Sequence, residues 1–89
     1  MGKINIAITG CLGRMGQQLI KSVNKDKSIK LVTLTENRLI NKKVGGIYPE
    51  LNTEKALNKA NVIIDFTIPK CTFEVLKIAT KLKKKVVIG

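Results

Sequence analysis

Short apolar runs alternate with stretches of helical periodicity along this chain of 89 residues. Four runs are rich in β-branched residues, which predicts buried strands at residues 3–9, 29–35, 61–66 and 85–88. Between them, apolar residues recur three or four positions apart, which predicts helices at residues 13–24 and 69–82. A short helix is also expected at residues 53–58, after a residue that can cap it. Apolar strands that alternate with helices are typical of a parallel sheet with crossover helices.

We therefore expect an α/β fold with a doubly wound, Rossmann-like sheet of strand order 3-2-1-4-5 and right-handed crossovers. The third strand is a short one at residues 47–51, which Pro49 confines to the edge of the sheet. The loop before it contains Gly45-Gly46, which suggests flexibility. Only Gly89 follows the last strand, so the chain is expected to be an incomplete part of a longer protein.

The helices show which faces should pack on the sheet. In the first helix, Met15, Leu19 and Val23 are spaced four apart and are expected on one buried face. Asn52 or Thr53 is expected to cap the second helix. The third helix carries an apolar stripe with flanking residues, namely Cys71, Val75, Ile78 and Leu82, widened by Phe73, Leu76 and Ala79.

Three glycines lie on the turn from the first strand into the first helix. Gly10 allows a sharp turn, Gly13 lets a ligand approach the backbone, and Gly16 lets the helix lie close to the strand. A helix N-terminus at such a turn offers free N–H groups and a positive dipole end to a dinucleotide's pyrophosphate. The alternative is a tight turn that binds no ligand.

Further candidates lie where the later strands end. Glu36 lies 20 residues after Gly16, the spacing expected of a carboxylate that holds an adenosine ribose. Arg38 is placed to meet a 2′-phosphate, and Phe66 and Thr67 to lie near a nicotinamide. Asp65 is interpreted as structural, because a carboxylate before a helix can accept backbone N–H bonds.

Composition restricts the possible functions. The chain contains 17 basic and six acidic residues, a net charge of +11, which leaves a basic nucleic-acid-binding module open. The lysines are scattered, however, and the chain has few aromatic residues on which bases could stack. We therefore expect no nucleic-acid partner. Without histidine, no metal site of the usual kind is expected.

The N-terminus lacks the features of a signal peptide, and no apolar run is long enough to span a membrane. We therefore expect a cytoplasmic protein with no membrane partner. Cys11 and Cys71 are expected to be reduced. Cys11 is interpreted as a small residue that fits the glycine loop and not as a reactive thiol, because no histidine can pair with it.

Three segments resemble the dihydrodipicolinate reductase family. Gly10-Cys11-Leu12-Gly13-Arg14-Met15-Gly16 resembles that family's Gly-x-x-Gly-Arg-Met-Gly signature. Ile64-Asp65-Phe66-Thr67-Ile68-Pro69 is similar to its Ile-Asp-Phe-Thr-x-Pro, and Val86-Val87-Ile88-Gly89 to the start of its Val-Ile-Gly-Thr-Thr-Gly segment. The three segments occur in the family's order and span almost the whole chain.

The resemblance implies the N-terminal nucleotide-binding portion of an enzyme of lysine (diaminopimelate) biosynthesis. Such an enzyme transfers hydride from NADH or NADPH to a cyclic dicarboxylate. By this analogy the backbone of Gly10, Cys11, Leu12, Gly13, Arg14 and Met15 wraps the pyrophosphate. Glu36 holds the ribose, while Phe66, Thr67 and Gly89 lie on the nicotinamide side.

The family's catalytic residues and homotetramer interface belong to a second domain, which residues 1–89 do not include. These residues alone are therefore expected to be inactive. Another possibility is an extended short-chain dehydrogenase or an NADP-sensing relative, because the glycine spacing fits both. Catalysis by the dehydrogenases needs Tyr-x-x-x-Lys, whereas Tyr48 is followed at that distance by Asn52.

Overall fold

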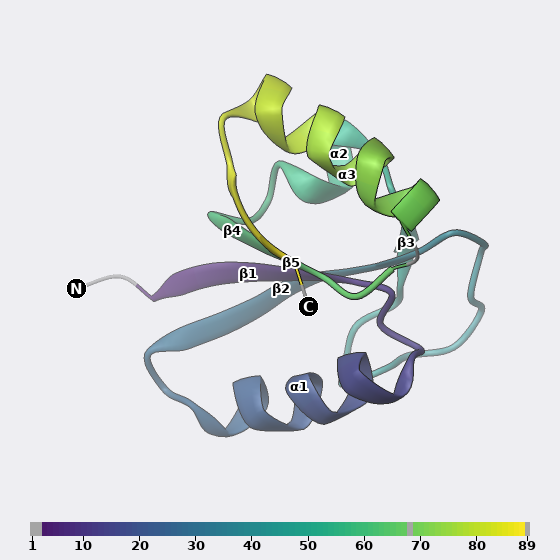
Figure 1. Cartoon of the computed structure of the whole chain (residues 1–89). Coiled ribbons are helices and arrows are strands. Elements are labelled where there is room, and N and C mark those ends of the chain that lie inside the picture. Colours follow the sequence, from purple (N-terminus) through teal and green to yellow (C-terminus); the bar gives the residue numbers. More distant parts are fainter. Residues whose placement is uncertain (1–2, 68, 89) are drawn as a thin grey trace.

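A computed structural model describes residues 3–67 and 69–88 and contains five parallel strands and three helices. The elements are β1 (Ile4–Thr9), α1 (Arg14–Lys25), β2 (Ile29–Glu36), β3 (Glu50–Leu51), α2 (Glu54–Leu57), β4 (Val62–Asp65), α3 (Pro69–Leu82) and β5 (Lys85–Ile88). The strand order β3-β2-β1-β4-β5 confirms the predicted doubly wound sheet. As Figure 1 shows, α1 covers one face of the sheet, and α2 and α3 cover the other. Within the described residues, no helix has the length and hydrophobicity needed to cross a membrane.

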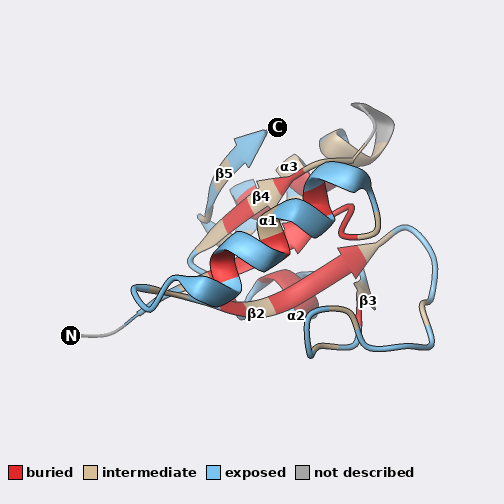
Figure 2. Cartoon of the chain, turned by 90° about the horizontal axis from the view of Figure 1, so that it is seen from below, coloured by how far each residue is buried: buried red, intermediate tan, exposed pale blue. Residues whose placement is uncertain are grey.

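The core consists of two apolar clusters, one on each face of the sheet. Ile6 and Ile8 of β1 belong to the cluster beneath α1, whereas Ala7 belongs to the cluster beneath α2 and α3. An irregularity in the pairing of β1 with β2 places both Leu31 and Leu34 in the α1 cluster. Figure 2 shows the buried residues concentrated in the central strands. Burial on both faces explains why apolar residues occur on both sides of these strands.

The packing faces of two helices agree with those expected only in part: Val23 of α1 is buried and Leu19 packs against the core, but one expected residue of each helix is exposed. Met15 is 59% exposed, because the buried face of α1 is formed by Gly16, Ile20 and Val23. Because Gly16 has no side chain, α1 can approach the rest of the fold most closely at this residue. The helix therefore packs through the side that carries Gly16, and Met15 faces away. Phe73 of α3 is likewise exposed, at 70%. Val75 and Ala79 are the buried residues of the predicted α3 stripe.

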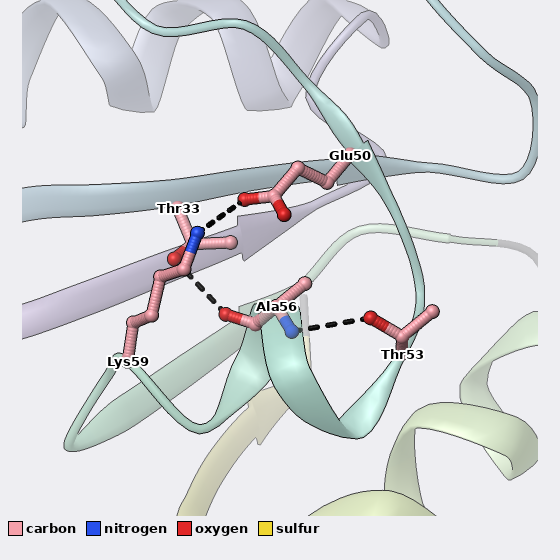
Figure 3. A network of polar contacts seen from close by, with 5 residues as sticks. All are labelled: Thr33, Glu50, Thr53, Ala56 and Lys59. Atoms are coloured by element: carbon pink, nitrogen blue, oxygen red, sulfur yellow. Dashed lines mark hydrogen bonds and ion pairs between the residues drawn. The ribbon is translucent and has the colours of Figure 1, made fainter.

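Hydrogen bonds fix the segment between β2 and β4, as drawn in Figure 3. The Thr53 hydroxyl caps α2 by accepting from the Ala56 N–H at 3.1 Å, which confirms one of the two expected caps. The buried Thr33 hydroxyl of β2 donates to the Ala56 carbonyl at 3.1 Å. Lys59 and Glu50 form an ion pair at 2.7 Å. Together these contacts attach α2 and the short strand β3 to the edge of the sheet.

The loop before β3 contains a hydrogen-bonded turn at its two glycines. Gly45 and Gly46 have φ of +57° and +88° and form a tight turn between Val44 and Ile47, which exchange two backbone hydrogen bonds. A Cβ on Gly45 would lie 2.5 Å from Ile20 of α1, so this turn packs against the helix. The strand expected at residues 47–51 is consequently limited to β3, because part of the segment completes the turn.

Candidate functional site

The glycine loop is packed too tightly for side chains at two of its three glycines. Gly10 has φ of +67°, and a Cβ there would lie 3.0 Å from the backbone C and O atoms of Phe66. A Cβ on Gly16 would lie 2.7 Å from the Gly10 carbonyl oxygen. Gly16 therefore brings the helix against the loop itself, a closer constraint than the strand contact expected. Gly13 is exposed, and its Cβ would meet only the Gly10 carbonyl oxygen, at 3.3 Å.

Internal hydrogen bonds use the first N–H groups of this loop. The Gly10 and Cys11 N–H groups donate to the Thr35 carbonyl, at 3.0 and 3.4 Å. The Leu12 N–H donates to a carboxylate oxygen of Glu36 at 2.8 Å. The end of β2 therefore holds the shape of the loop through both backbone and side chain.

The start of α1 has no such partners. Its N-cap is Gly13; among the described residues no side chain caps the helix, and its first turn carries no acidic residue. The N–H groups of Arg14 and Met15 lie in this first turn, where the backbone has no earlier helical carbonyl to bond. This end of the helix therefore presents unbonded donors and the positive end of the helix dipole.

A cleft of about 180 Å³ opens at the carboxyl ends of β1, β2 and β4. It is lined by Gly10, Gly13, Glu36, Asn37, Phe66, Thr67 and Cys71. A second cleft, of about 270 Å³, is lined by Glu36, Asn37, Leu51, Asn52, Cys71 and Glu74. Because the two share three lining residues, they form a continuous depression along this edge of the sheet. The first cleft lies where neighbouring strands are connected in opposite directions, the usual ligand position in such sheets.

The fold thus brings five of the predicted site residues to one cleft: Gly10, Gly13, Glu36, Phe66 and Thr67. The side chains of Met15 and Arg38 are exposed and line neither of the two clefts. Arg14 and Leu12 line a separate depression beside α1 with Lys21. Any contact of Arg14 or Met15 with a ligand in the first cleft is therefore expected from the backbone. Gly89 lies outside the described residues.

The Cys11 thiol is buried beneath the glycine loop. Burial, and to a smaller extent the nearby negative charge of Glu36, raise its pKa to about 11. The thiol is therefore protonated at neutral pH and is a poor nucleophile. This supports the interpretation of Cys11 as a small residue that fits the loop.

Asp65 is fully buried at the end of β4 and accepts four hydrogen bonds. Its Oδ1 accepts from the hydroxyl of Thr9, from the hydroxyl of Thr67 at 2.6 Å and from the Thr67 N–H at 3.3 Å. Its Oδ2 accepts from the Thr72 hydroxyl at 2.5 Å. Burial by itself would raise the pKa of Asp65, but the hydrogen bonds from these threonines outweigh it and lower the pKa. The structural interpretation of Asp65 is therefore supported by its contacts.

This lowered pKa predicts a pH dependence of stability. Ionised Asp65 stabilises the fold fully above the ordinary aspartate pKa of 3.8, and the contribution is lost as the pH falls through the lower folded value. We expect Asp65→Asn to reduce the free energy of unfolding at pH 7, and this difference from the unaltered protein to shrink below about pH 4. Denaturant titrations from pH 2 to 7 measure it. Asp26→Asn is the control, because Asp26 is an exposed aspartate whose pKa is lowered by Ser28 alone; an equal effect there would contradict the special role of Asp65.

Comparison with known families decides the relationship of this chain. Residues 4–89 match the family model described as dihydrodipicolinate reductase, N-terminus. The chain belongs to the dihydrodipicolinate reductase family. The three resembling segments thus identified the family correctly, and the matched region includes every residue of the two clefts.

Curated and solved relatives agree with this family. The chain is 63% identical over its full length to the 4-hydroxy-tetrahydrodipicolinate reductase of Pelagibacter ubique, of which it covers 34%. It resembles the structure of dipicolinate-bound dihydrodipicolinate reductase from Paenisporosarcina sp. TG-14, with a TM-score of 0.74 and 25% identity. That match covers 99% of this chain and 37% of the other. The chain therefore spans about a third of the length of these family members.

The same fold occurs in a protein of different sequence. Aspartate semialdehyde dehydrogenase from Candida albicans, solved with NADP, matches with a TM-score of 0.81 at 11% identity. The match covers 99% of this chain and 30% of the dehydrogenase. At this identity the likeness shows the fold alone, and it confirms the Rossmann-like architecture of this dihydrodipicolinate reductase family member.

Sequence reasoning assigned no site role to several residues that line the clefts. Asn37 and Cys71 line both clefts, and Asn52 lines the second. Cys71 lies in the first turn of α3, whose N-terminus follows the end of β4. The predicted topology could have placed Cys71 near the point where neighbouring strands are connected in opposite directions. The placement of Asn52 depends on the short edge strand β3 and had no comparable signal.

Proposed function

We propose that this chain binds a nicotinamide dinucleotide as the N-terminal part of a 4-hydroxy-tetrahydrodipicolinate reductase. In the longer protein, the cofactor transfers hydride to a cyclic dicarboxylate in lysine biosynthesis. The names of the family and of the Pelagibacter relative support this assignment. The observation that carries it is the uncapped start of α1 at a cleft that also contains Glu36.

The pyrophosphate is assigned to the first turn of α1. The N–H groups of Arg14 and Met15 have no partner among the described residues, whereas those of Gly10, Cys11 and Leu12 are already bonded. Gly13 lies between these two groups and is exposed to the cleft. Two anionic phosphates there would complete the missing hydrogen bonds and interact favourably with the helix dipole.

The two halves of the cofactor are assigned to opposite ends of the depression. Glu36 accepts the ribose hydroxyls of the adenosine half, with Asn52 and Leu51 lining the neighbouring cleft. Phe66 and Thr67 line the first cleft at the end of β4 and take the nicotinamide half. Glu36 is then both a ligand contact and, through the oxygen that accepts from the Leu12 N–H, a support for the glycine loop. Gly89 is kept as a proposed contact of the nicotinamide side by resemblance to the family's third segment.

Titration with NADH by calorimetry tests the proposed binding. A chain with net charge +11 attracts any polyphosphate, so inorganic tripolyphosphate serves as the comparison ligand. We expect NADH to bind more tightly than tripolyphosphate despite its smaller charge, and to depend less steeply on salt. Tighter binding of tripolyphosphate at every salt concentration would mean that charge alone attracts these ligands and would reject the assignment.

We further propose that both NADH and NADPH are used, with less than about tenfold preference. Glu36 favours the free ribose hydroxyls of NADH, while Arg38, two residues later and exposed, can pair with the 2′-phosphate of NADPH. An exposed ion pair contributes only about 0–1 kcal/mol, so neither cofactor gains a large advantage. The cytoplasm and a homotetramer remain the expected location and assembly of the longer protein, by resemblance to the family.

Arg38→Ala is expected to weaken NADPH binding by up to about fivefold and to leave NADH binding unchanged. The NADPH loss should shrink at high salt, because salt screens exposed charges. Lys42→Ala is the matched control, since it removes one positive charge from the same exposed loop. The test measures the dissociation constants of NADH and NADPH for the unaltered chain and the two variants, at two salt concentrations. Equal NADPH losses in the two variants would show that Arg38 contributes only general charge.

A further inference from the structure

Thr67 links the cleft to the buried carboxylate of Asp65. It lines the cleft beside Phe66, and its hydroxyl lies 2.6 Å from Asp65 Oδ1. The Thr9 hydroxyl contacts the same oxygen from β1, and the Thr72 hydroxyl lies 2.5 Å from Oδ2. One carboxylate therefore meets three hydroxyl groups, of which the Thr67 hydroxyl belongs to a residue of the first cleft.

The chemistry of a carboxylate determines the direction of these hydrogen bonds. The pKa of Asp65 lies below its ordinary value, since the threonine hydrogen bonds outweigh the effect of burial, so the group is ionised at neutral pH. An ionised carboxylate can only accept, and each hydroxyl has a single hydrogen to donate. The Thr67 hydroxyl therefore donates its one hydrogen bond to Asp65. Only the oxygen lone pairs of Thr67 remain, with the Thr72 hydroxyl as a neighbour at 3.3 Å, so any hydrogen bond with a ligand in the cleft is one that this hydroxyl accepts.

We propose that Asp65 is a positioning residue that fixes the Thr67 hydroxyl as a hydrogen-bond acceptor, which selects the amino group of a nicotinamide carboxamide. This inference rests on the proposed function, which assigns the nicotinamide half to this end of the cleft. A carboxamide has a donor end and an acceptor end, so a fixed acceptor distinguishes them. A ribose hydroxyl can rotate to donate or accept and would gain less from a fixed partner. The fixed polarity of Thr67 thereby favours one orientation of the carboxamide.

An analogue that lacks only the amino group tests this proposal. The reduced 3-acetylpyridine adenine dinucleotide carries a methyl group in its place and retains the carbonyl group. We expect the unaltered chain to bind NADH about three- to tenfold more tightly than this analogue, as the loss of one hydrogen bond implies. Thr67→Val removes the hydroxyl with little change of shape. In this variant the ratio of the two dissociation constants, analogue over NADH, should fall to about one. Thr67→Ser should retain the preference for NADH.

Two further variants separate positioning from stability. Asp65→Asn introduces a side-chain N–H donor beside Thr67, so we expect the ratio to fall although the Thr67 hydroxyl is retained. Thr9→Val is the matched control, because it removes a different hydroxyl from the same carboxylate and should leave the ratio unchanged. If Asp65→Asn does not fold, the comparison of Thr67→Val with Thr9→Val decides.

The outcomes distinguish this inference from the proposed function. A selective fall of the ratio in Thr67→Val supports the acceptor role. Equal weakening of both ligands in that variant, or an unaltered chain that binds both ligands equally, would overturn it and leave nucleotide binding intact. If the unaltered chain binds neither ligand, the proposed function itself fails, and this inference fails with it.

Discussion

Replacing Gly10 by alanine is expected to lower the free energy of unfolding by about 3 kcal/mol, from backbone strain and overpacking together. The backbone at Gly10 has φ of +67°, a conformation that costs an alanine about 1–2 kcal/mol. The added Cβ would also lie 3.0 Å from two backbone atoms of Phe66 and 3.2 Å from the Thr67 methyl carbon. Backbone at the end of a central strand cannot move aside as a flexible side chain can.

Gly46→Ala is the matched control for this prediction. Gly46 also has a positive φ, of +88°, but a Cβ there would meet nothing within 4 Å. Its replacement should therefore cost only the conformational strain, about 1 kcal/mol. Urea unfolding of the three proteins gives both differences. Equal losses at the two positions would mean that the contact of Gly10 with Phe66 is not a constraint on the fold.

The strands could be predicted because the sheet is covered on both faces, which places apolar residues on both sides of β1, β2 and β4. The packing face of α1 could not be predicted as easily. Periodicity suggested Met15, Leu19 and Val23. Val23 is buried as expected, but the start of the helix packs through Gly16 and not through Met15, and glycine carries no hydrophobic signal. Close backbone approach determined the face, and only the glycine pattern itself indicated that approach. β3 was shorter than expected, because the preceding glycines form a turn.

The candidate site was predictable where its residues occupy fixed positions relative to strand ends. Gly10, Gly13 and Glu36 follow from the spacing of strand, turn and helix, and they meet at the first cleft. The contact between Glu36 and the Leu12 N–H was not predictable, since it depends on a loop conformation that the sequence does not specify. Residues of the second cleft, such as Asn52, depend on how β3 attaches to the sheet edge.

Replacing each of the two glycines at the cleft is expected to impair a different property, folding at Gly10 and ligand binding at Gly13. Gly10 is needed for the chain to fold into this loop, because its conformation and its neighbours both exclude a side chain. Gly13 has φ of −68° and ψ of 160°, which any residue can adopt, and it is exposed. A side chain at Gly13 is therefore compatible with the fold and interferes only with what approaches the start of α1.

Gly13→Val is accordingly expected to leave folding largely intact and to weaken NADH binding about a hundredfold or more, equivalent to about 2.7 kcal/mol. The branched side chain would stand in the cleft beside the free N–H groups of the first turn of α1 and keep phosphates away from them. Gly13→Ala is the graded control, because its Cβ meets only the Gly10 carbonyl oxygen, at 3.3 Å. Its affinity should lie between those of the unaltered chain and the valine variant.

Calorimetric titration with NADH measures the loss of binding, and urea unfolding measures any loss of stability, so the two effects are separated. Unchanged binding in the valine variant would show that Gly13 serves the packing of the loop alone, and the pyrophosphate would have to be assigned to another part of the cleft.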